Sequence, residues 1–296
     1  MIKRFIKNSQ IKLEVRVKKN PKSFLAKLYM QALNISRPLY FSNEFLLIKG
    51  LKRKPRGNQR SILFFTVHKS ASTFLKITVN DLLKNEKLIS IDLSGFLHSK
   101  KKQSEYYNNP LVMKQILKEK GYFYGAFRSY YHFPGMEKYK IILVLRDPRD
   151  VLTSYYFSTL YSHPLGRKEV FIEREKYANM CIDDFVLERA GEFKKRYEDY
   201  CKYLIGKENV LFLKYEDMIS EFKPWLNKLS SFIGASNNDE VINSIVAKTS
   251  FEVKQEDPHS FIRSIKANDY KNKLKPETIE MLTNTFKEEL ITLGYS

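Results

Sequence analysis

Short apolar runs alternate with longer stretches of helical periodicity along most of this chain. Five apolar runs are short enough for buried strands and lie at residues 62–67, 88–93, 121–127, 141–145 and 210–213. Apolar residues recur at helical spacing in the stretches 74–83, 111–120, 181–205, 221–233, 239–247 and 276–290. Strands that alternate with helices favour a parallel sheet with helices on both of its faces. We therefore predict an α/β fold with a central parallel β-sheet flanked by helices.

Positive charge is concentrated at the start of the chain. The 296 residues carry a formal net charge of +19, and residues 1–60 hold 16 Lys and Arg against two acids, which is +14. We therefore divide the chain into a basic N-terminal extension, residues 1–60, and a folded domain, residues 61–296. A basic arm can contact nucleic acid, an anionic membrane surface or an acidic polymer, or it can be a solvated surface. We regard nucleic acid as the less favoured partner.

The sequence argues against several classes of protein. Two cysteines, Cys181 and Cys201, form neither a disulfide framework nor a zinc-ligand pattern. The basic N-terminus lacks the apolar core and cleavage site of a signal peptide. No uninterrupted run of 18 apolar residues is present, so we expect no membrane span. We expect a cytoplasmic protein.

The stretch from Ser61 to Leu75, SILFFTVHKSASTFL, predicts a strand, a turn of small residues and a helix. That geometry directs several backbone N–H groups and the helix dipole at one point, where an anion is favoured. Lys69 adds a positive charge, so we predict a phosphate or sulfate site. The stretch contains no glycine and therefore does not match the nucleoside triphosphate loop G-x-x-x-x-G-K-[ST]. The alternative is a junction whose serines and threonine merely cap the helix.

A second candidate anion site follows the apolar run 141–145. Arg146 directly follows that run, and Ser154 lies eight residues later, inside a predicted helix. Ligands bind at the carboxyl edge of open α/β sheets, so Arg146 and Ser154 can converge there on one phosphate. The alternative is that Arg146 forms a surface ion pair with Asp150.

Five segments, taken in order, resemble the PAPS-dependent sulfotransferases, which use 3′-phosphoadenosine 5′-phosphosulfate (PAPS) as donor. These segments are HKSASTFL (68–75), RDPRDVLTSYY (146–156), VLFLKYEDM (210–218), KTSFEVKQEDP (248–258) and FIRSIKANDYKNKLKPE (261–277). The first resembles the family's 5′-phosphosulfate loop and the second its 3′-phosphate motif. The resemblance implies the P-loop-like sulfotransferase fold for residues 61–296, PAPS as cofactor with PAP as its product, and no metal.

The resemblance also implies roles for individual residues. Lys69 would contact the 5′-phosphosulfate and assist the leaving group. The remaining residues would cradle the 5′-phosphate (Ser70, Ala71, Ser72 and Thr73), bind the 3′-phosphate (Arg146, Ser154 and Arg263) or line the adenine (Phe74, Tyr215, Thr249 and Phe251).

The sequence departs from the family pattern at several of these positions. Ala71 replaces a loop glycine, so we expect the turn to avoid positive φ there. Ser264 and Ile265 replace a Lys-Gly pair and thereby remove one cation from the 3′-phosphate. Asn268 replaces a glycine but can itself adopt the left-handed conformation, and Tyr270 replaces a tryptophan.

The general base is the least determined part of the predicted site. The K-T-H-x-P context of the cytosolic branch is absent, and His132 is the nearest histidine beyond the third strand. Asp92 lies where polysaccharide-modifying branches carry an acid. Each has a simpler reading, a solvent-exposed loop histidine and a helix-capping aspartate. His68, beside the loop lysine, is more typical of a residue that shapes the loop.

Three segments rich in Tyr, Phe and His, Ser94–Asn109, Ser129–Glu137 and Ser158–Met180, are expected to form loops around an acceptor pocket. Aromatic walls suit a small organic acceptor, whereas basic loops would equally attract an anionic glycan. The alternatives from other classes are a P-loop kinase, a non-catalytic nucleic-acid binder, and an inactive family member that holds PAP. The oligomeric state is left open.

Overall fold

A computed structural model describes residues 58–295, apart from residues 87, 100–105, 107, 164–167, 236–238 and 261, together with residues 28, 31, 41, 44–46 and 55. The basic N-terminal extension expected over residues 1–60 lies almost entirely outside the described residues.

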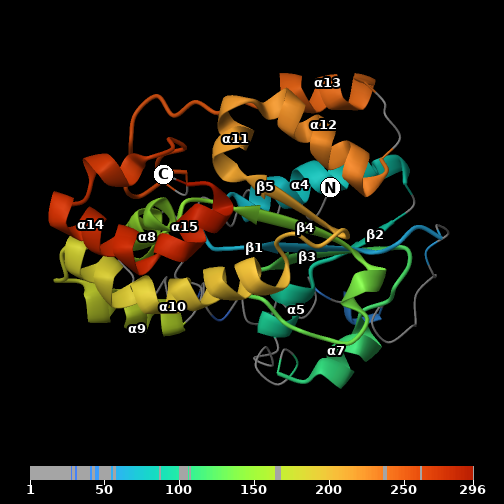
Figure 1. The fold of residues 1–296 in the computed structure, drawn as a ribbon, viewed down its shortest axis with the longest axis horizontal. Coiled ribbons are helices and arrows are strands. Elements are labelled where there is room, and N and C mark those ends of the chain that lie inside the picture. Colours follow the sequence, from blue (N-terminus) through green and yellow to red (C-terminus); the bar gives the residue numbers. More distant parts are fainter. Residues whose placement is uncertain are drawn as a thin grey trace.

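The core of the described chain is a sheet of five parallel strands in the order β2-β3-β1-β4-β5 (Figure 1). The strands are β1 (Ile62–Thr66), β2 (Ile89–Ile91), β3 (Tyr122–Phe127), β4 (Lys140–Leu145) and β5 (Val210–Lys214). All five fall within the apolar runs of the sequence or one residue beyond them, and the predicted α/β fold with a parallel sheet is confirmed. The central strand β1 is buried along its whole length, as expected for a strand covered on both faces.

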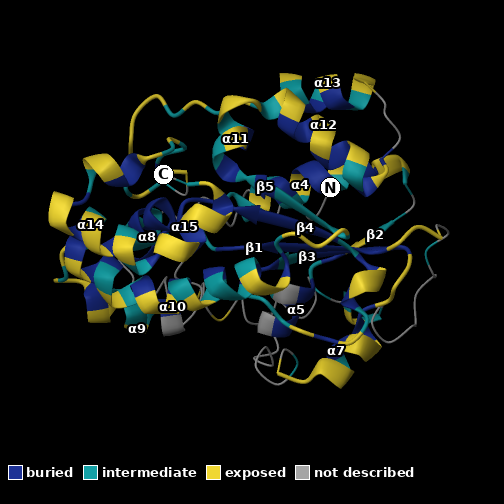
Figure 2. Ribbon diagram, viewed as in Figure 1, coloured by how far each residue is buried: buried dark blue, intermediate teal, exposed yellow. Residues whose placement is uncertain are grey.

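Alternate residues of β1 point to opposite faces of the sheet, and each face has its own apolar core. Leu63 and Phe65 pack on the side of α5 (Leu93–Ser99), α8 (Pro148–Phe157) and α10 (Ile182–Tyr203), whereas Ile62 and Phe64 pack on the side of α4 (Ser72–Leu82) and α12 (Phe222–Ile233). The helices of the two layers lie on opposite sides of the sheet in Figure 1, and Figure 2 shows their buried sides turned toward it.

The helices have the following bounds: α4 (Ser72–Leu82), α5 (Leu93–Ser99), α7 (Pro110–Ile116), α8 (Pro148–Phe157), α9 (Lys168–Tyr177), α10 (Ile182–Tyr203), α11 (Tyr215–Ser220), α12 (Phe222–Ile233), α13 (Asp239–Ala247), α14 (Pro276–Thr285) and α15 (Lys287–Leu293). Short 3₁₀ turns include η4 (Asp269–Asn272).

Two of the three expected acceptor loops contain helix. Helix α5 occupies the start of Ser94–Asn109, since Phe96 and Leu97 reach the core and the Asp92 carboxylate accepts the Gly95 amide at 3.0 Å. The segment Ser158–Met180 contains a π-helical turn, Ser158–Ser162, and α9, whose Val170 and Tyr177 are buried two turns apart. The prediction of loops was wrong for these parts because their apolar residues do not recur at helical spacing, and in α9 three of them are consecutive, at positions 170–172.

The helix expected over 276–290 is divided. Phe286, with φ −101°, separates α14 from α15, and its ring is buried in the core. Helix α10 matches its prediction closely, with Cys181 at its N-cap and Cys201 in its last turn, and neither cysteine is in a disulfide. Among the described helices, none combines the length and apolar character that crossing a bilayer requires.

The strand register brings two of the predicted anion-binding segments together. Thr66 of β1 pairs with Val144 of β4, so both strands end at the same edge of the sheet. Lys69 and Arg146 follow these paired residues by three and two positions. The carboxyl edge of the sheet therefore positions both residues of the predicted site.

Candidate functional site

The loop between β1 and α4 turns through two left-handed residues. Lys69 has φ 64° and Ala71 has φ 56°, so the expectation that Ala71 avoids positive φ was wrong. In this conformation the chain passes from the end of β1 at Thr66 to the start of α4 at Ser72 within five residues. Left-handed residues alternating with others turn successive N–H groups toward a common concavity, which is an anion-binding arrangement.

The first turn of α4 is not capped by a side chain. Its N-cap residue is Ala71, which has no hydroxyl to accept a hydrogen bond, although its carbonyl accepts the Leu75 amide at 3.0 Å. The alternative in which serines and a threonine of the loop merely cap the helix therefore does not hold. The first N–H groups of α4 are left for a ligand or for water.

Three buried polar atoms at this edge of the sheet have no hydrogen-bond partner within the described part of the chain. They are Ser70 Oγ, Arg146 Nε and Arg263 Nε. Buried polar groups are normally paired, so each unpaired one requires an explanation. A serine hydroxyl and two guanidinium N–H groups are suitable donors for phosphate oxygens, and these residues fit a ligand with two phosphate groups.

The charge of Lys69 is destabilised in the ligand-free site. Burial, followed by the charges of Arg146, Arg263 and Arg128, lowers its pKa to about 8. Four cationic residues therefore face one region, and a bound anion would offset their repulsion. Arg128, which follows β3, also donates from Nη2 to Ser72 Oγ at 3.2 Å. The sequence prediction missed Arg128, although a cation directly after a buried strand is the same signal that identified Arg146.

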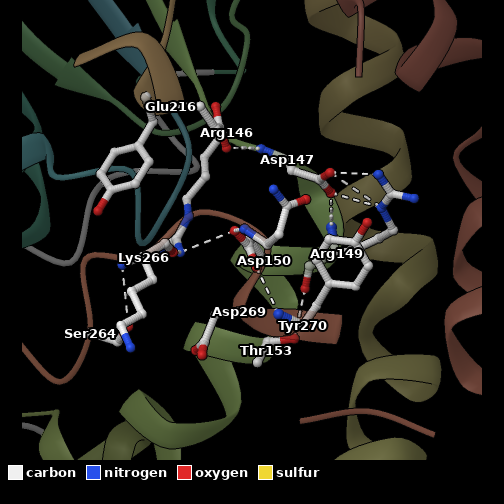
Figure 3. Close-up of polar contacts among 12 residues, drawn as sticks. Arg146, Asp147, Arg149, Asp150, Thr153, Glu216, Ser264, Lys266, Asp269 and Tyr270 are labelled. Atoms are coloured by element: carbon white, nitrogen blue, oxygen red, sulfur yellow. Dashed lines mark hydrogen bonds and ion pairs between the residues drawn. The ribbon is translucent and has the colours of Figure 1, made fainter. Parts of the chain in front are cut away.

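Arg146 connects three segments that lie far apart in the sequence. Its Nη1 donates to the Lys69 carbonyl at 3.3 Å, and its Nη2 donates to Asp150 Oδ2 at 3.3 Å and to the Lys266 carbonyl at 3.0 Å (Figure 3). Its guanidinium carbon lies 4.6 Å from the ring centroid of Tyr215. The ion pair with Asp150 exists, but the two side chains are only 3% and 0% exposed, so it is not a surface pair.

Asp150 also holds the C-terminal element of the site in place. Its Oδ2 accepts the Asn268 amide at 2.8 Å and its Oδ1 accepts the Tyr270 amide at 2.9 Å, and Figure 3 shows this carboxylate between Arg146 and Tyr270. Asn268 adopts the left-handed conformation, φ 60°, as expected for the residue that stands in for glycine. One carboxylate thus fixes both Arg146 and the segment that follows Arg263.

Helix α8 brings Ser154 and Arg263 toward the same place. Asp150, Ser154 and Phe157 are spaced four and three residues apart and so share one face of the helix. The guanidinium carbon of Arg263 lies 4.1 Å from the Phe157 ring centroid. Arg263 also forms ion pairs through Nη1 with Glu256 and through Nη2 with Asp269. Arg146, Ser154 and Arg263, the three residues assigned to the 3′-phosphate, therefore lie along one helix face.

The residues assigned to the adenine fall into two places. Phe74 and Phe251 meet edge to face, with ring centroids 5.5 Å apart, and Phe222 joins them at 5.8 and 5.1 Å. Phe222 was not predicted, because it lies outside the resembling segments.

Tyr215, also assigned to the adenine, lies instead against Arg146 and donates to the Ile265 carbonyl at 3.1 Å. The Thr249 hydroxyl donates to the Ile245 carbonyl at 2.8 Å.

The two candidate bases are both engaged in other contacts. Asp92 accepts from Lys76 Nζ at 2.6 Å and from the Gly95 amide, so it acts as the helix-capping residue that the simpler reading described. His132 is exposed, and its Nδ1 lies 3.0 Å from the Tyr130 hydroxyl.

His68 is held as a neutral ring beside the loop lysine. Burial, followed by the charges of Arg128 and Arg196, lowers its pKa well below the usual value. Arg196 Nη1 lies 3.1 Å from His68 Nδ1, and because arginine can only donate, Nδ1 accepts and Nε2 carries the proton. In this state His68 can donate a hydrogen bond from Nε2. Its Nδ1 is occupied by the hydrogen bond from Arg196 and is not available as a base.

No group of three or more His, Cys, Asp or Glu side chains with metal-binding geometry occurs in the part of the chain that the structure describes.

Comparisons with known proteins agree with this geometry. The family model for the sulfotransferase domain matches residues 59–294. Sulfotransferase 1B1 of Canis lupus familiaris is 28% identical over 170 residues, covering 51% of this chain and 54% of that protein. Flavonol 3-sulfotransferase of Flaveria bidentis is 26% identical over 220 residues, covering 62% of this chain and 69% of that protein. The match to the dog protein thus spans about half of its length.

The fold is shared with a solved structure. Mouse sulfotransferase SULT7A1, crystallised in complex with PAP, superposes with a TM-score of 0.55 at 18% identity, covering 82% of this chain and 89% of that one. This likeness concerns the arrangement of the sheet and its helices.

Proposed function

Because the chain belongs to the sulfotransferase family, we propose that it transfers a sulfuryl group from PAPS to a hydroxyl or amine of a small organic acceptor. The observation that carries this proposal is the contact between Arg146 Nη1 and the Lys69 carbonyl. It holds the loop and the strand-end arginine together, which supports a single site that would take two phosphates. PAPS carries one phosphate on the 3′ oxygen of its ribose and another on the 5′ oxygen, whereas ATP has no 3′-phosphate.

The donor would be held from both sides of its ribose. The amides and hydroxyls of residues 70–73 would bind the 5′-phosphate, with Ser70 Oγ gaining the partner that it lacks. Arg146, Ser154 and Arg263 would bind the 3′-phosphate. The adenine would lie near Phe74 and Phe251, where aromatic side chains offer stacking surfaces. When bound, the donor supplies the sulfuryl group, whose bond to the phosphate oxygen breaks as its bond to the acceptor forms.

Lys69 is assigned to the leaving group. Its ammonium would neutralise the charge that develops on the oxygen between phosphorus and sulfur, which is the main demand of in-line group transfer. Arg128, which directly follows β3 and is close enough to lower the pKa of Lys69, would add positive charge on the same side. For the proton of the acceptor the candidates stay those of the sequence, Asp92 and His132, and each would have to give up its contact with Lys76 or Tyr130 to take it.

A small organic acceptor is the reading that we favour. It is supported by the aromatic side chains of segment 129–137, where Tyr130 stacks on Tyr203 with ring centroids 4.7 Å apart and ring planes 9° apart. The plant relative is named for a flavonol, a small phenolic acceptor. Apolar and aromatic walls with a few polar groups are typical of sites for such molecules.

The donor site is tested by calorimetric titration with PAP, AMP and ATP·Mg²⁺. We expect PAP to bind without metal and much more tightly than AMP, because only PAP engages the 3′-phosphate residues. Arg146→Gln should reduce PAP affinity by at least about tenfold, since one charged hydrogen-bond partner contributes about 1.5–3 kcal/mol. Preference for ATP·Mg²⁺, or no binding of PAP by folded protein, would contradict the proposal.

Catalysis is tested separately by Lys69→Met. We expect this variant to retain measurable PAP binding but to lose about 100-fold or more in sulfuryl transfer, as when one transition-state donor is removed elsewhere. Lys84→Met, which changes an exposed lysine after α4, is the matched control and should behave as the wild type. Transfer that survives in Lys69→Met would refute the role given to this lysine.

A further inference from the structure

The guanidinium group of Arg263 is bound by two carboxylates. Nη1 donates to Glu256 Oε1 and Nη2 donates to Asp269 Oδ2, while Nε is buried and has no partner among the described residues. The ring of Phe157 lies against the guanidinium plane. Arg263 therefore cannot give a phosphate a paired contact through Nη1 unless a carboxylate leaves.

The two carboxylates differ in how firmly they are held. The side chain of Asp269 is 7% exposed, and the residues on either side of it, Asn268 and Tyr270, are fixed by their amides to Asp150. The side chain of Glu256 is 37% exposed and lies on an irregular segment that follows α13. Glu256 is thus the carboxylate that can move away at small cost.

Glu256 has a second cation available when it leaves Arg263. Lys273 Nζ lies 3.1 Å from Glu256 Oε2 and can retain the carboxylate after the guanidinium is released. Partial burial raises the pKa of Glu256, but the hydrogen bonds from Lys273 and Arg263 outweigh this effect and leave the pKa below its usual value. Glu256 is therefore a carboxylate at neutral pH and competes as an anion.

We propose that Glu256 is an internal competitor of the donor's 3′-phosphate, occupying on Arg263 the position that this phosphate takes. This inference rests on the proposed function. Glu256 leaves Arg263 when the nucleotide binds and returns to it when PAP dissociates. The contact thus weakens the binding of both PAPS and PAP and favours release of the product.

The same segment also carries a residue assigned to the adenine. Phe251 lies five residues before Glu256 and packs against Phe74 and Phe222. Displacement of Glu256 would thus move a segment that contacts the other end of the nucleotide. Recognition of the 3′-phosphate and closure over the base would then be linked through residues 251–256.

The test is PAP and AMP binding by Glu256→Gln, which keeps the size of the side chain but removes its charge. We expect PAP to bind about two- to fivefold more tightly and to dissociate correspondingly more slowly, the range expected from a partly exposed ion pair. AMP has no 3′-phosphate to compete with Glu256, so its affinity should be unchanged. Thermal unfolding establishes that the variant is folded.

Two further variants distinguish competition from other effects. Glu252→Gln removes an exposed charge from the same segment without touching Arg263 and should leave PAP affinity unchanged. Asp269→Asn should weaken PAP binding, because Asp269 orients the guanidinium for the phosphate. Opposite effects of Glu256→Gln and Asp269→Asn on PAP affinity would support the proposal.

Several results would overturn it. Unchanged or weaker PAP binding by Glu256→Gln means that Glu256 does not compete with the phosphate. An equal gain in Glu252→Gln means that only the general charge of the segment matters. If the wild-type protein binds PAP while either of these results is obtained, the inference fails and the proposed function stands. Absence of PAP binding by folded wild-type protein overturns both.

Discussion

The two regions that form the candidate donor site, around Lys69 and around Arg146, differ in how the protein stabilises a buried positive charge. Around Lys69, burial and three arginines all act against the ammonium and lower its pKa to about 8. Around Arg146, the buried carboxylate of Asp150 and the carbonyls of Lys69 and Lys266 receive the guanidinium N–H groups. In the first region the surroundings disfavour the charged form of Lys69 as long as no anion is bound. In the second region, protein oxygens accept hydrogen bonds from both terminal nitrogens of the Arg146 guanidinium.

This difference assigns different tasks to the two regions. A group whose charge is opposed in the free protein gains most when an opposite charge binds, which suits the residue that faces the reacting atoms. A group whose charge is already paired forms a rigid frame that holds its position with or without a ligand. Since Arg146 also touches the Lys69 carbonyl, the frame positions the loop. Removing a charge from the frame should therefore cost both stability and ligand binding, whereas the charge of Lys69 in the loop should matter mainly when the ligand is bound.

The largest effect on stability is expected for Asp150→Asn. This change leaves Arg146 buried without its counter-charge and turns an amide NH₂ toward an amide N–H of Asn268 or Tyr270, whichever way the side chain is oriented. Breaking a buried ion pair by removing one partner costs about 3–5 kcal/mol. We expect the free energy of unfolding, measured in urea, to fall by about 3 kcal/mol, together with loss of PAP binding.

The control for that experiment is Asp199→Asn. Asp199 pairs with Lys195 at 2.9 Å on the surface of α10, and the lysine side chain is 70% exposed. Exposed helical pairs contribute about 0.3–0.5 kcal/mol, so this variant should unfold close to the wild type. Equal stability of the two variants would show that the frame around Arg146 is not held by its charges.

The contribution of Lys69 in the loop, in contrast, should be visible in the pH dependence of PAP binding. The pKa of Lys69 in the free protein is about 8, and a bound phosphate favours the protonated form and raises this pKa. Binding therefore takes up a proton above pH 8, and PAP affinity should fall as pH rises, by up to about tenfold for each unit above the free pKa. Calorimetry between pH 7 and 9.5 measures this slope.

Lys69→Arg provides the matched comparison, because a guanidinium stays charged throughout this range. Its PAP affinity should change little between pH 7 and 9.5. A wild-type profile as flat as that of Lys69→Arg would mean that the loop lysine does not titrate in the free protein, and the contrast between the two regions would lose its electrostatic basis.

Sequence reasoning predicted the frame better than it predicted the contacts within it. Apolar runs located all five strands, and the order of strand, turn and helix placed Lys69 and Arg146 at one edge of the sheet. These features depend on local patterns. The hydrogen bond from Arg146 to the Lys266 carbonyl joins residues far apart in the sequence, and the pairing of Glu256 with Arg263 lies on irregular segments. No period or spacing identifies such contacts.

The backbone of the loop was misjudged for a related reason. The absence of glycine at position 71 suggested a turn without positive φ, but Ala71 adopts φ 56° between a buried strand and a helix whose Leu75 is buried in the core. Tertiary context therefore imposed on alanine a conformation that local propensity disfavours. The same kind of override explains α5, where two buried side chains and an aspartate cap create a helix in a stretch that is mostly polar.

The smallest expected effect comes from Ala71→Gly, which tests whether the loop stores backbone strain. A non-glycine residue in the left-handed region costs about 1–2 kcal/mol, whereas glycine adds about 0.5–1 kcal/mol of unfolded-state entropy. We expect the free energy of unfolding to rise by about 0.5 kcal/mol, with PAP affinity within twofold because the amides are retained. Ala247→Gly at the end of α13, where no positive φ is present, should lower it instead. Destabilisation by both changes would show that position 71 is not strained, and the loop would then differ from the frame in its charge alone.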